Sequence, residues 1–308
     1  MLLQRVLAAS GIIFFLIVAL CADFFWLKDQ SLFLHLYCLV GTFYCYREFW
    51  TLCRTAGYQT FSTWGTLSGC ALVAVHFWAL NIWTTQYDQR DLVYLHKADL
   101  LLNGAMVAAI LGTFWLSARR HQYQASLGGL GGACLGLLYI WFLPSFVLKL
   151  RHMGADGVLG GLDWNLFGTK MVIATIVISK GCDVFAYLLG RKLGSHKAFP
   201  NLSPGKTKEG VAAGLAGSVL LALLLRWPDI NVLPQSVFSL AETVCFGMLI
   251  GFSGIMGDLS ESLLKRSAGV KDASHVIPGY GGVLDVVDSL VVAGPVAYFL
   301  IPVIINLN

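Results

Sequence analysis

Charged residues are scarce in this 308-residue sequence: Asp, Glu, Lys and Arg make up 12% of it, and 57% of the positions are hydrophobic. A soluble globular domain carries about 25% charged residues. The low charge and the mean hydropathy of +0.71 exclude an ordinary soluble protein and indicate that the chain folds in a lipid bilayer. The formal net charge is only +4, so we expect no nucleic acid among its partners.

Paired cysteines and polar linkers are also missing. The eight cysteines are scattered and form no CxxC pair, so the spacing typical of structural zinc sites is absent. We expect these residues to act as small apolar groups in helix packing. No repeat or low-complexity tract interrupts the chain, and nothing indicates a separate soluble domain.

Long apolar runs are what the sequence has in abundance. A run of about 18 or more apolar residues is long enough to cross a bilayer as a helix. Lipid offers no hydrogen-bond partner to an open strand edge, so these runs are predicted to be helices. We therefore predict an all-α, polytopic integral membrane protein with about nine transmembrane helices. The runs lie near residues 6–25, 31–49, 63–83, 99–117, 126–149, 166–190, 210–227, 240–264 and 284–306.

The two parts of the chain differ in where their charges lie. The runs before residue 165 have almost no internal charge, so residues 1–165 are predicted to be an N-terminal transmembrane scaffold. Between residues 166 and 308, ionisable side chains occur within or beside apolar runs, where charges are costly and usually functional. This part is predicted to be a C-terminal transmembrane catalytic region. Lys and Arg gather in the connections after the second, fourth, sixth and eighth runs, which places those connections in the cytoplasm.

The first polar cluster of the C-terminal part contains Lys180, Asp183 and Tyr187. Spacings of three and four residues put these side chains on one face of a helix. A buried structural ion pair explains the cluster as well as a functional site does.

The second cluster runs from Ser203 through Lys206 and Thr207 to Gly210, just before an apolar run. A glycine-containing turn that enters a helix offers free backbone amides and positive charge to a phosphate. The GxxxxGK[ST] spacing of a Walker loop is absent, and a solvated basic loop has the same composition.

The third cluster is the most specific. Four polar residues share one helical stripe: Asp258, Glu261, Ser262 and Lys265. Beyond a turn rich in Gly and Pro, Asp285 faces the same way as Asp288. Carboxylates brought together in this way suit Mg²⁺, which prefers a few carboxylates together with substrate phosphates and water.

The segment from Gly257 to Ser289 resembles the signature of phosphatidate cytidylyltransferases, the CDP-diacylglycerol synthases. That signature reads S-x-x-K-R, four residues, K-D, then P-G-H-G-G and D-R-x-D, and this chain matches most of it. Asp183 and the SPGKTKEG segment resemble two earlier motifs of the family, so the likeness covers about residues 180–300. Two positions depart from the pattern: Tyr280 replaces the usual His, and Val286 replaces the usual Arg, a phosphate or carboxylate partner that Val cannot replace.

The resemblance implies transfer of a cytidylyl group from CTP to phosphatidic acid, with release of pyrophosphate, by an enzyme of the lipid bilayer. It implies Mg²⁺ or another divalent cation and a bacterial inner membrane, and a homodimer is one arrangement considered. Our hypothesis takes Asp258 and Asp285 as the main metal ligands, with Asp183 and Asp288 as weaker ones. Catalytic roles are expected for Glu261, Ser262, Lys265 and Asp288, and phosphate binding for Ser203, Lys206, Thr207, Arg266 and Lys271.

Several other functions stay open at this point. A polyprenol or phytol kinase or an archaeol cytidylyltransferase would share the membrane embedding and the acidic metal site. A secondary transporter also has intramembrane charges and helices interrupted by glycine. The departures at Tyr280 and Val286 leave room for a degenerate family member with a binding role.

Overall fold

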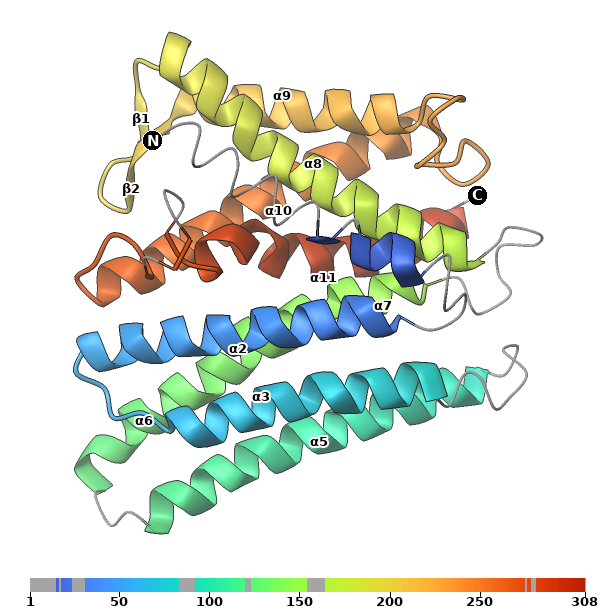
Figure 1. Cartoon of the computed structure of the whole chain (residues 1–308). Coiled ribbons are helices and arrows are strands. Elements are labelled where there is room, and N and C mark those ends of the chain that lie inside the picture. Colours follow the sequence, from blue (N-terminus) through green and yellow to red (C-terminus); the bar gives the residue numbers. More distant parts are fainter. Residues whose placement is uncertain are drawn as a thin grey trace.

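The structure is a computed structural model, and it describes residues 15–16, 18–23, 31–82, 92–119, 123–153, 164–274, 276–277 and 281–307. Long helices run side by side through it (Figure 1). The N-terminal part contains α2 (Leu32–Thr55), α3 (Ser62–Phe77), α5 (Leu92–Arg119), α6 (Tyr123–Gly136) and α7 (Leu143–Arg151). Short π-helical segments extend α3 (Trp78–Ile82) and join α6 to α7 (Leu137–Phe142). The C-terminal part contains α8 (Trp164–Leu193), α9 (Lys208–Leu225), α10 (Leu240–Ser267) and α11 (Leu284–Leu307).

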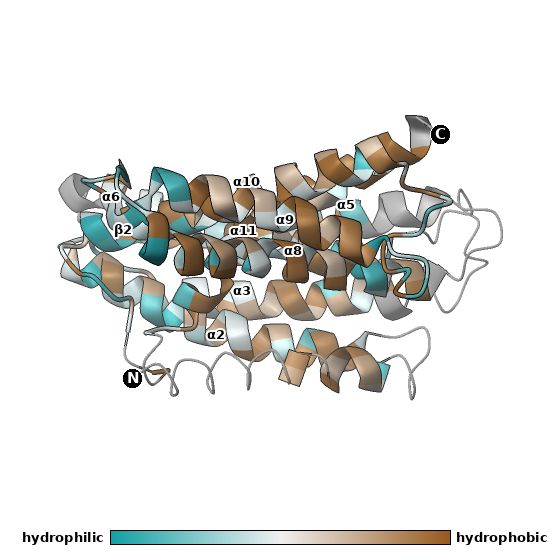
Figure 2. Ribbon diagram, turned by 90° about the horizontal axis from the view of Figure 1, so that it is seen from above, coloured by the Kyte–Doolittle hydropathy of each residue, from teal (hydrophilic) through white to brown (hydrophobic). Residues whose placement is uncertain are grey.

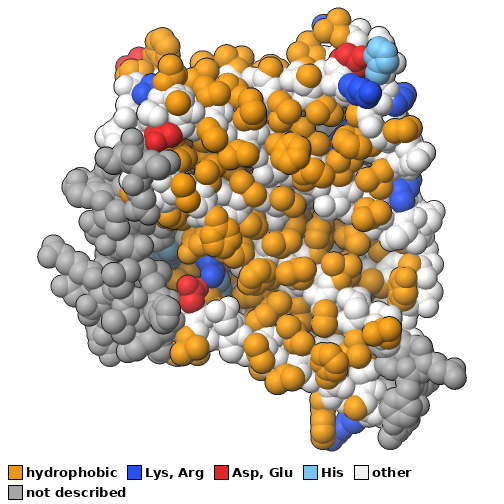
Figure 3. Space-filling view, turned by 180° about the vertical axis from the view of Figure 1, so that it is seen from behind, with side chains coloured by type: hydrophobic (Ala, Val, Ile, Leu, Met, Phe, Trp, Pro, Cys, Tyr) orange, Lys and Arg blue, Asp and Glu red, His pale blue; other side chains and the backbone are white. Residues whose placement is uncertain are grey.

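Seven helical segments of the described residues are long and apolar enough to cross a membrane, which confirms an all-α, polytopic membrane protein. Hydrophobic residues occupy the middle of the bundle in Figure 2, and apolar side chains cover much of the face in Figure 3. The expected first run, 6–25, lies mostly outside the described residues. The second corresponds to α2, a 24-residue helix whose last turns carry Arg47, Glu48 and Arg54 and are therefore less apolar.

The second polar cluster is a strand rather than a simple turn. Strands β1 (Lys197–Phe199) and β2 (Ser203–Thr207) pair antiparallel, with Lys197 opposite Thr207. The Thr207 hydroxyl then accepts a hydrogen bond from Gly210 N at 3.1 Å and caps α9. Arg266 Nε donates to the Leu202 carbonyl at 3.3 Å, so the hairpin and the end of α10 lie at the same end of the bundle. This agrees with the expectation that both connections are on one side of the membrane.

The apolar core joins the two parts of the chain. One cluster of buried side chains includes Leu34 and Leu148 together with Phe246 and Ile301. Glycines let the C-terminal helices approach closely: a Cβ on Gly214 would lie 2.9 Å from the Cys182 carbonyl oxygen, so the backbones of α8 and α9 meet directly. The division into a scaffold and a catalytic region at residue 165 remains a prediction.

Candidate active site

The candidate site forms where α10 crosses α11. A Cβ on Gly257 would lie 2.3 Å from the Asp288 carbonyl oxygen and 2.9 Å from Ser289 Cα, so only glycine permits this approach. The crossing brings Asp258 and Glu261 of α10 to Asp288 of α11. One carboxylate oxygen of each of these three residues lies within 4.8 Å of the other two. Three carboxylates at this spacing are able to bind a divalent cation.

Two lysines from other elements neutralise this group. Lys180 Nζ on α8 lies 2.9 Å from Asp288 Oδ1 and 3.9 Å from Asp183 Oδ2. Lys206 Nζ on β2 lies 2.5 Å from Asp258 Oδ2. Charges within a membrane bundle require such partners, because lipid does not solvate them. The hairpin and α8 therefore belong to the same site as α10 and α11.

A third lysine connects the two crossing helices directly. Lys265 Nζ lies 2.5 Å from Glu261 Oε2, one turn earlier on α10, and 2.5 Å from Asp285 Oδ1 on α11. The other oxygen of Asp285 accepts a hydrogen bond from Gly282 N at 2.7 Å. Both Asp285 oxygens thus have donors, whereas Asp288 belongs to the close acidic group. This grouping differs from our hypothesis, which took Asp258 and Asp285 as the main metal ligands and Asp288 as a weaker one.

The remaining predicted residues lie on β2, on α10 and in the connection after α10. The Thr207 hydroxyl caps α9, and the Arg266 guanidinium, which is exposed, donates to the carbonyls of Leu202 and Val270. Lys271 is exposed, Ser203 is half-buried on β2, and Ser262 is buried on α10. Tyr280 lies outside the described residues. Val286, which replaces the arginine of the family pattern, lies in the first turn of α11. The positive charge beside Asp288 comes from Lys180 on α8.

Three buried hydroxyls beside these charges have no hydrogen-bond partner among the described residues: Tyr139, Ser179 and Ser289. Ser179 precedes Lys180, and Ser289 follows Asp288. Tyr139 lies in the π-helical segment between α6 and α7, within electrostatic range of Asp258, Glu261 and Asp288. Buried hydroxyls are usually hydrogen-bonded, so these groups have capacity for water or a ligand.

Sequence reasoning missed one acidic residue of this region, Glu48. It lies near the end of α2, in the part predicted to be scaffold, and its carboxylate contacts the first residues of α11. The available signal was the position of an acid at the edge of the apolar run 31–49.

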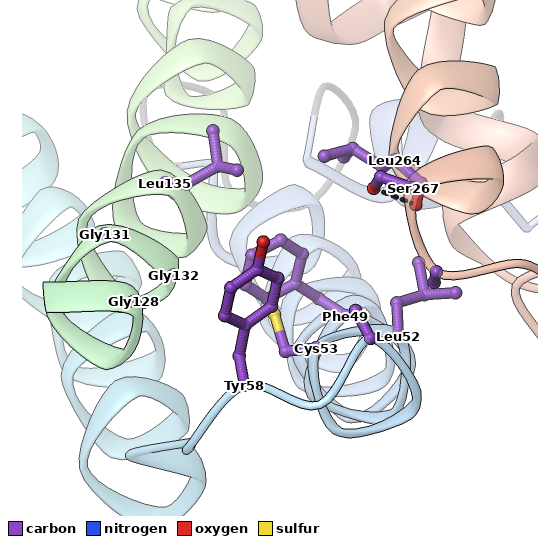
Figure 4. A pocket seen from close by; sticks show the side chains of 12 residues that line it. Phe49, Leu52, Cys53, Tyr58, Gly128, Gly131, Gly132, Leu135, Leu264 and Ser267 are labelled. Carbon is purple, nitrogen blue, oxygen red and sulfur yellow. Dashed lines mark hydrogen bonds between the residues drawn. The ribbon is translucent and has the colours of Figure 1, made fainter. Parts of the chain in front are cut away.

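A separate cavity of about 320 Å³ opens between α2, α6 and α10 (Figure 4). Its walls are mostly apolar, and they include Phe49, Leu135 and Leu264. The Ser267 hydroxyl in its wall already donates to the Leu264 carbonyl at 2.8 Å. None of the three clustered carboxylates lines this cavity, so it is distinct from the acidic site.

A bundle that holds carboxylates and lysines among apolar helices defines a membrane protein with an intramembrane polar site. Comparison with known proteins then identifies its family. The chain belongs to the cytidylyltransferase family, whose model matches residues 3–304.

Three relatives illustrate the similarity. A chloroplast protein of Arabidopsis thaliana named phosphatidate cytidylyltransferase 4 is 39% identical over 225 residues, which are 68% of this chain and 54% of the relative. This chain therefore spans about half the length of that relative. Phosphatidate cytidylyltransferases of Synechocystis and of Pseudomonas aeruginosa are 33% and 34% identical, over 70% and 64% of this chain. These matches cover 75% and 88% of the two bacterial proteins.

Proposed function

We propose that the chain transfers a cytidylyl group from CTP to phosphatidic acid and produces CDP-diacylglycerol and pyrophosphate for phospholipid biosynthesis. The observation that carries this proposal is the group of Asp258, Glu261 and Asp288 oxygens within 4.8 Å of one another, with lysines beside it. The names of the relatives support the choice of substrates. The chemistry of the site supports the choice of reaction.

The reaction joins two anions. An oxygen of the lipid phosphate forms a bond to the α-phosphorus of CTP, and the bond from that phosphorus to the oxygen bridging to the β-phosphorus breaks. The electron pair leaves with pyrophosphate. A phosphate is already an anionic nucleophile near neutral pH, so the site needs no general base. Its main task is to hold the reactants in line and to neutralise their charge.

The family suggests a reaction that depends on a divalent cation, and the donor set fits Mg²⁺. Asp258, Glu261 and Asp288 would hold it, and it would supply charge neutralisation between the phosphates. Lys206 and Lys265 contact carboxylates at 2.5 Å, and we assign their ammonium groups to the binding of substrate phosphates. Asp285 keeps Lys265 directed toward the site, and Asp183 supports Lys180.

The proposal includes the bacterial inner membrane, with the hairpin end of the bundle in the cytoplasm, where CTP is available. It also retains the homodimer considered from the sequence. Light scattering of the detergent-solubilised protein tests the dimer independently of activity.

The test follows pyrophosphate release from CTP in mixed micelles of phosphatidic acid, with the lipid product identified by mass spectrometry. We expect wild-type turnover, and a loss on the order of 100-fold or more in Asp258→Asn, because a ligand and a lysine partner are removed together. The control is Asp229→Asn, since Asp229 is exposed in the connection between α9 and α10. Release of CDP instead of pyrophosphate would identify a lipid kinase. Full activity in Asp258→Asn would contradict the site assignment.

A further inference from the structure

Glu48 is a buried carboxylate, and among the described residues its hydrogen bonds come from the segment that leads into α11 and from the first residue of that helix. Its side chain is only 3% exposed. Oε1 accepts hydrogen bonds from Ser274 Oγ at 2.7 Å and from Val283 N at 2.9 Å, and Oε2 accepts one from Leu284 N at 2.8 Å. Within the described part of the chain, no Lys, Arg or His lies in ion-pair range of it. A side chain of α2 thus provides the N-terminal cap of a helix more than 230 residues away.

Physical chemistry explains why an anion is stable at this position. The first amides of a helix have no partner within the helix, and the helix dipole places partial positive charge there. Hydrogen bonds from amides to a carboxylate are among the stronger ones. Because Glu48 occupies these amides, the N-terminus of α11 is not available to a substrate phosphate. The N-terminus of α11 therefore contributes to the site through its position and not by binding substrate.

The contact also explains why glycine occupies position 282, at the end of the turn before α11. A Cβ on Gly282 would lie 2.4 Å from Glu48 Oε2, so any other residue would displace the carboxylate. Gly281 has a φ of +114°, a conformation that favours glycine. The turn is thus shaped to bring the start of α11 against α2.

The position of this helix end determines where the carboxylates of α11 lie. Asp285 follows Leu284 directly and holds Lys265, and Asp288, one turn later, belongs to the acidic group. A shift of the start of α11 would move both carboxylates relative to α10.

We infer that Glu48 is a positioning residue of the active site, which ties the start of α11 to α2 so that Asp285 and Asp288 meet their partners on α10. This inference rests on the proposed function for its kinetic test. A second readout, Mn²⁺ binding followed by electron paramagnetic resonance, does not depend on turnover.

The experiment compares Glu48→Gln and Ser274→Ala with wild type in full-length protein. Glu48→Gln keeps the size of the side chain and removes its charge, and Ser274→Ala removes one of the three donors. The matched control is Glu242→Gln, because Glu242 accepts a hydrogen bond from Ser239 N at 2.7 Å at the start of α10, at the opposite end of that helix from the site. Thermal unfolding in detergent measures how much each variant lowers the melting temperature through the loss of a helix cap.

We expect Glu48→Gln to lower kcat by roughly 100-fold, the effect of a displacement of about 1 Å at a catalytic centre. We also expect weaker Mn²⁺ binding and little change in the KM for CTP, with Ser274→Ala showing the same pattern to a smaller extent. Glu242→Gln should lower the melting temperature without changing Mn²⁺ binding or kcat.

Wild-type kcat and Mn²⁺ affinity in folded Glu48→Gln would overturn the inference. If that variant does not fold, the same result in Ser274→Ala overturns it. If the wild-type protein releases no pyrophosphate, the proposed function fails, and the Mn²⁺ measurements still decide the role of Glu48.

Discussion

Replacement of Gly257 by Ala tests whether the close crossing of α10 and α11 creates the active site. The added Cβ would lie 2.3 Å from the Asp288 carbonyl oxygen, whereas ordinary contacts begin at 3.4 Å. The helices must therefore separate by about 1 Å, which moves Asp288 away from Asp258. A displacement of this size costs roughly 100-fold in turnover. Overpacking in a close-packed region also costs about 1–3 kcal/mol of stability.

The control is Gly104→Ala on α5. Gly104 is exposed, and its added Cβ would meet nothing within 4 Å. Both substitutions gain the same intrinsic helix preference, about 0.5–1 kcal/mol, so their difference isolates the steric effect. Pyrophosphate release, Mn²⁺ affinity and thermal unfolding are measured for both variants. If Gly257→Ala stays within about twofold of Gly104→Ala in turnover and Mn²⁺ affinity, the crossing does not determine the geometry of the site.

Two further predictions separate the roles of the hairpin residues. Lys206→Met should lower turnover by about tenfold or more and strengthen Mn²⁺ binding, because Asp258 loses a competing cation at 2.5 Å. Weaker Mn²⁺ binding in this variant would show that Lys206 instead holds Asp258 in place. Thr207→Val should lower stability by about 1 kcal/mol through loss of the α9 cap, with kcat retained at low temperature. If Thr207→Val has wild-type stability but no longer releases pyrophosphate, the hydroxyl binds nucleotide instead.

The local pattern of the sequence was sufficient for the helices and for one face of the site. Spacing placed Glu261 and Lys265 on one stripe, and the structure confirms their contact within α10. The apolar runs predicted most of the bundle, because length and apolar composition are local properties. The last turns of α2 are less apolar for a local reason as well, because they carry charged residues.

What the sequence did not reveal depends on contacts between distant segments. Periodicity placed Asp285 and Asp288 on one face, yet the structure gives them different partners, Lys265 and Lys180. Gly257 has no distinguishing local signal, since its role depends on the backbone of α11. The hairpin was missed because a five-residue strand before an apolar helix has the composition of a loop.

The balance of charge at the site suggests why the lysines and carboxylates are interleaved. Each of Lys180, Lys206 and Lys265 contacts a carboxylate, so the polar residues solvate one another inside the bundle. Lys206 and Lys265 would compete with a divalent cation for the carboxylates of Asp258 and Glu261. The displaced ammonium groups would then be available to the triphosphate and to the lipid phosphate, both of which carry negative charge. Under the proposed function, cation and nucleotide binding therefore favour each other, and the same lysines serve as counter-ions to carboxylates and to phosphates.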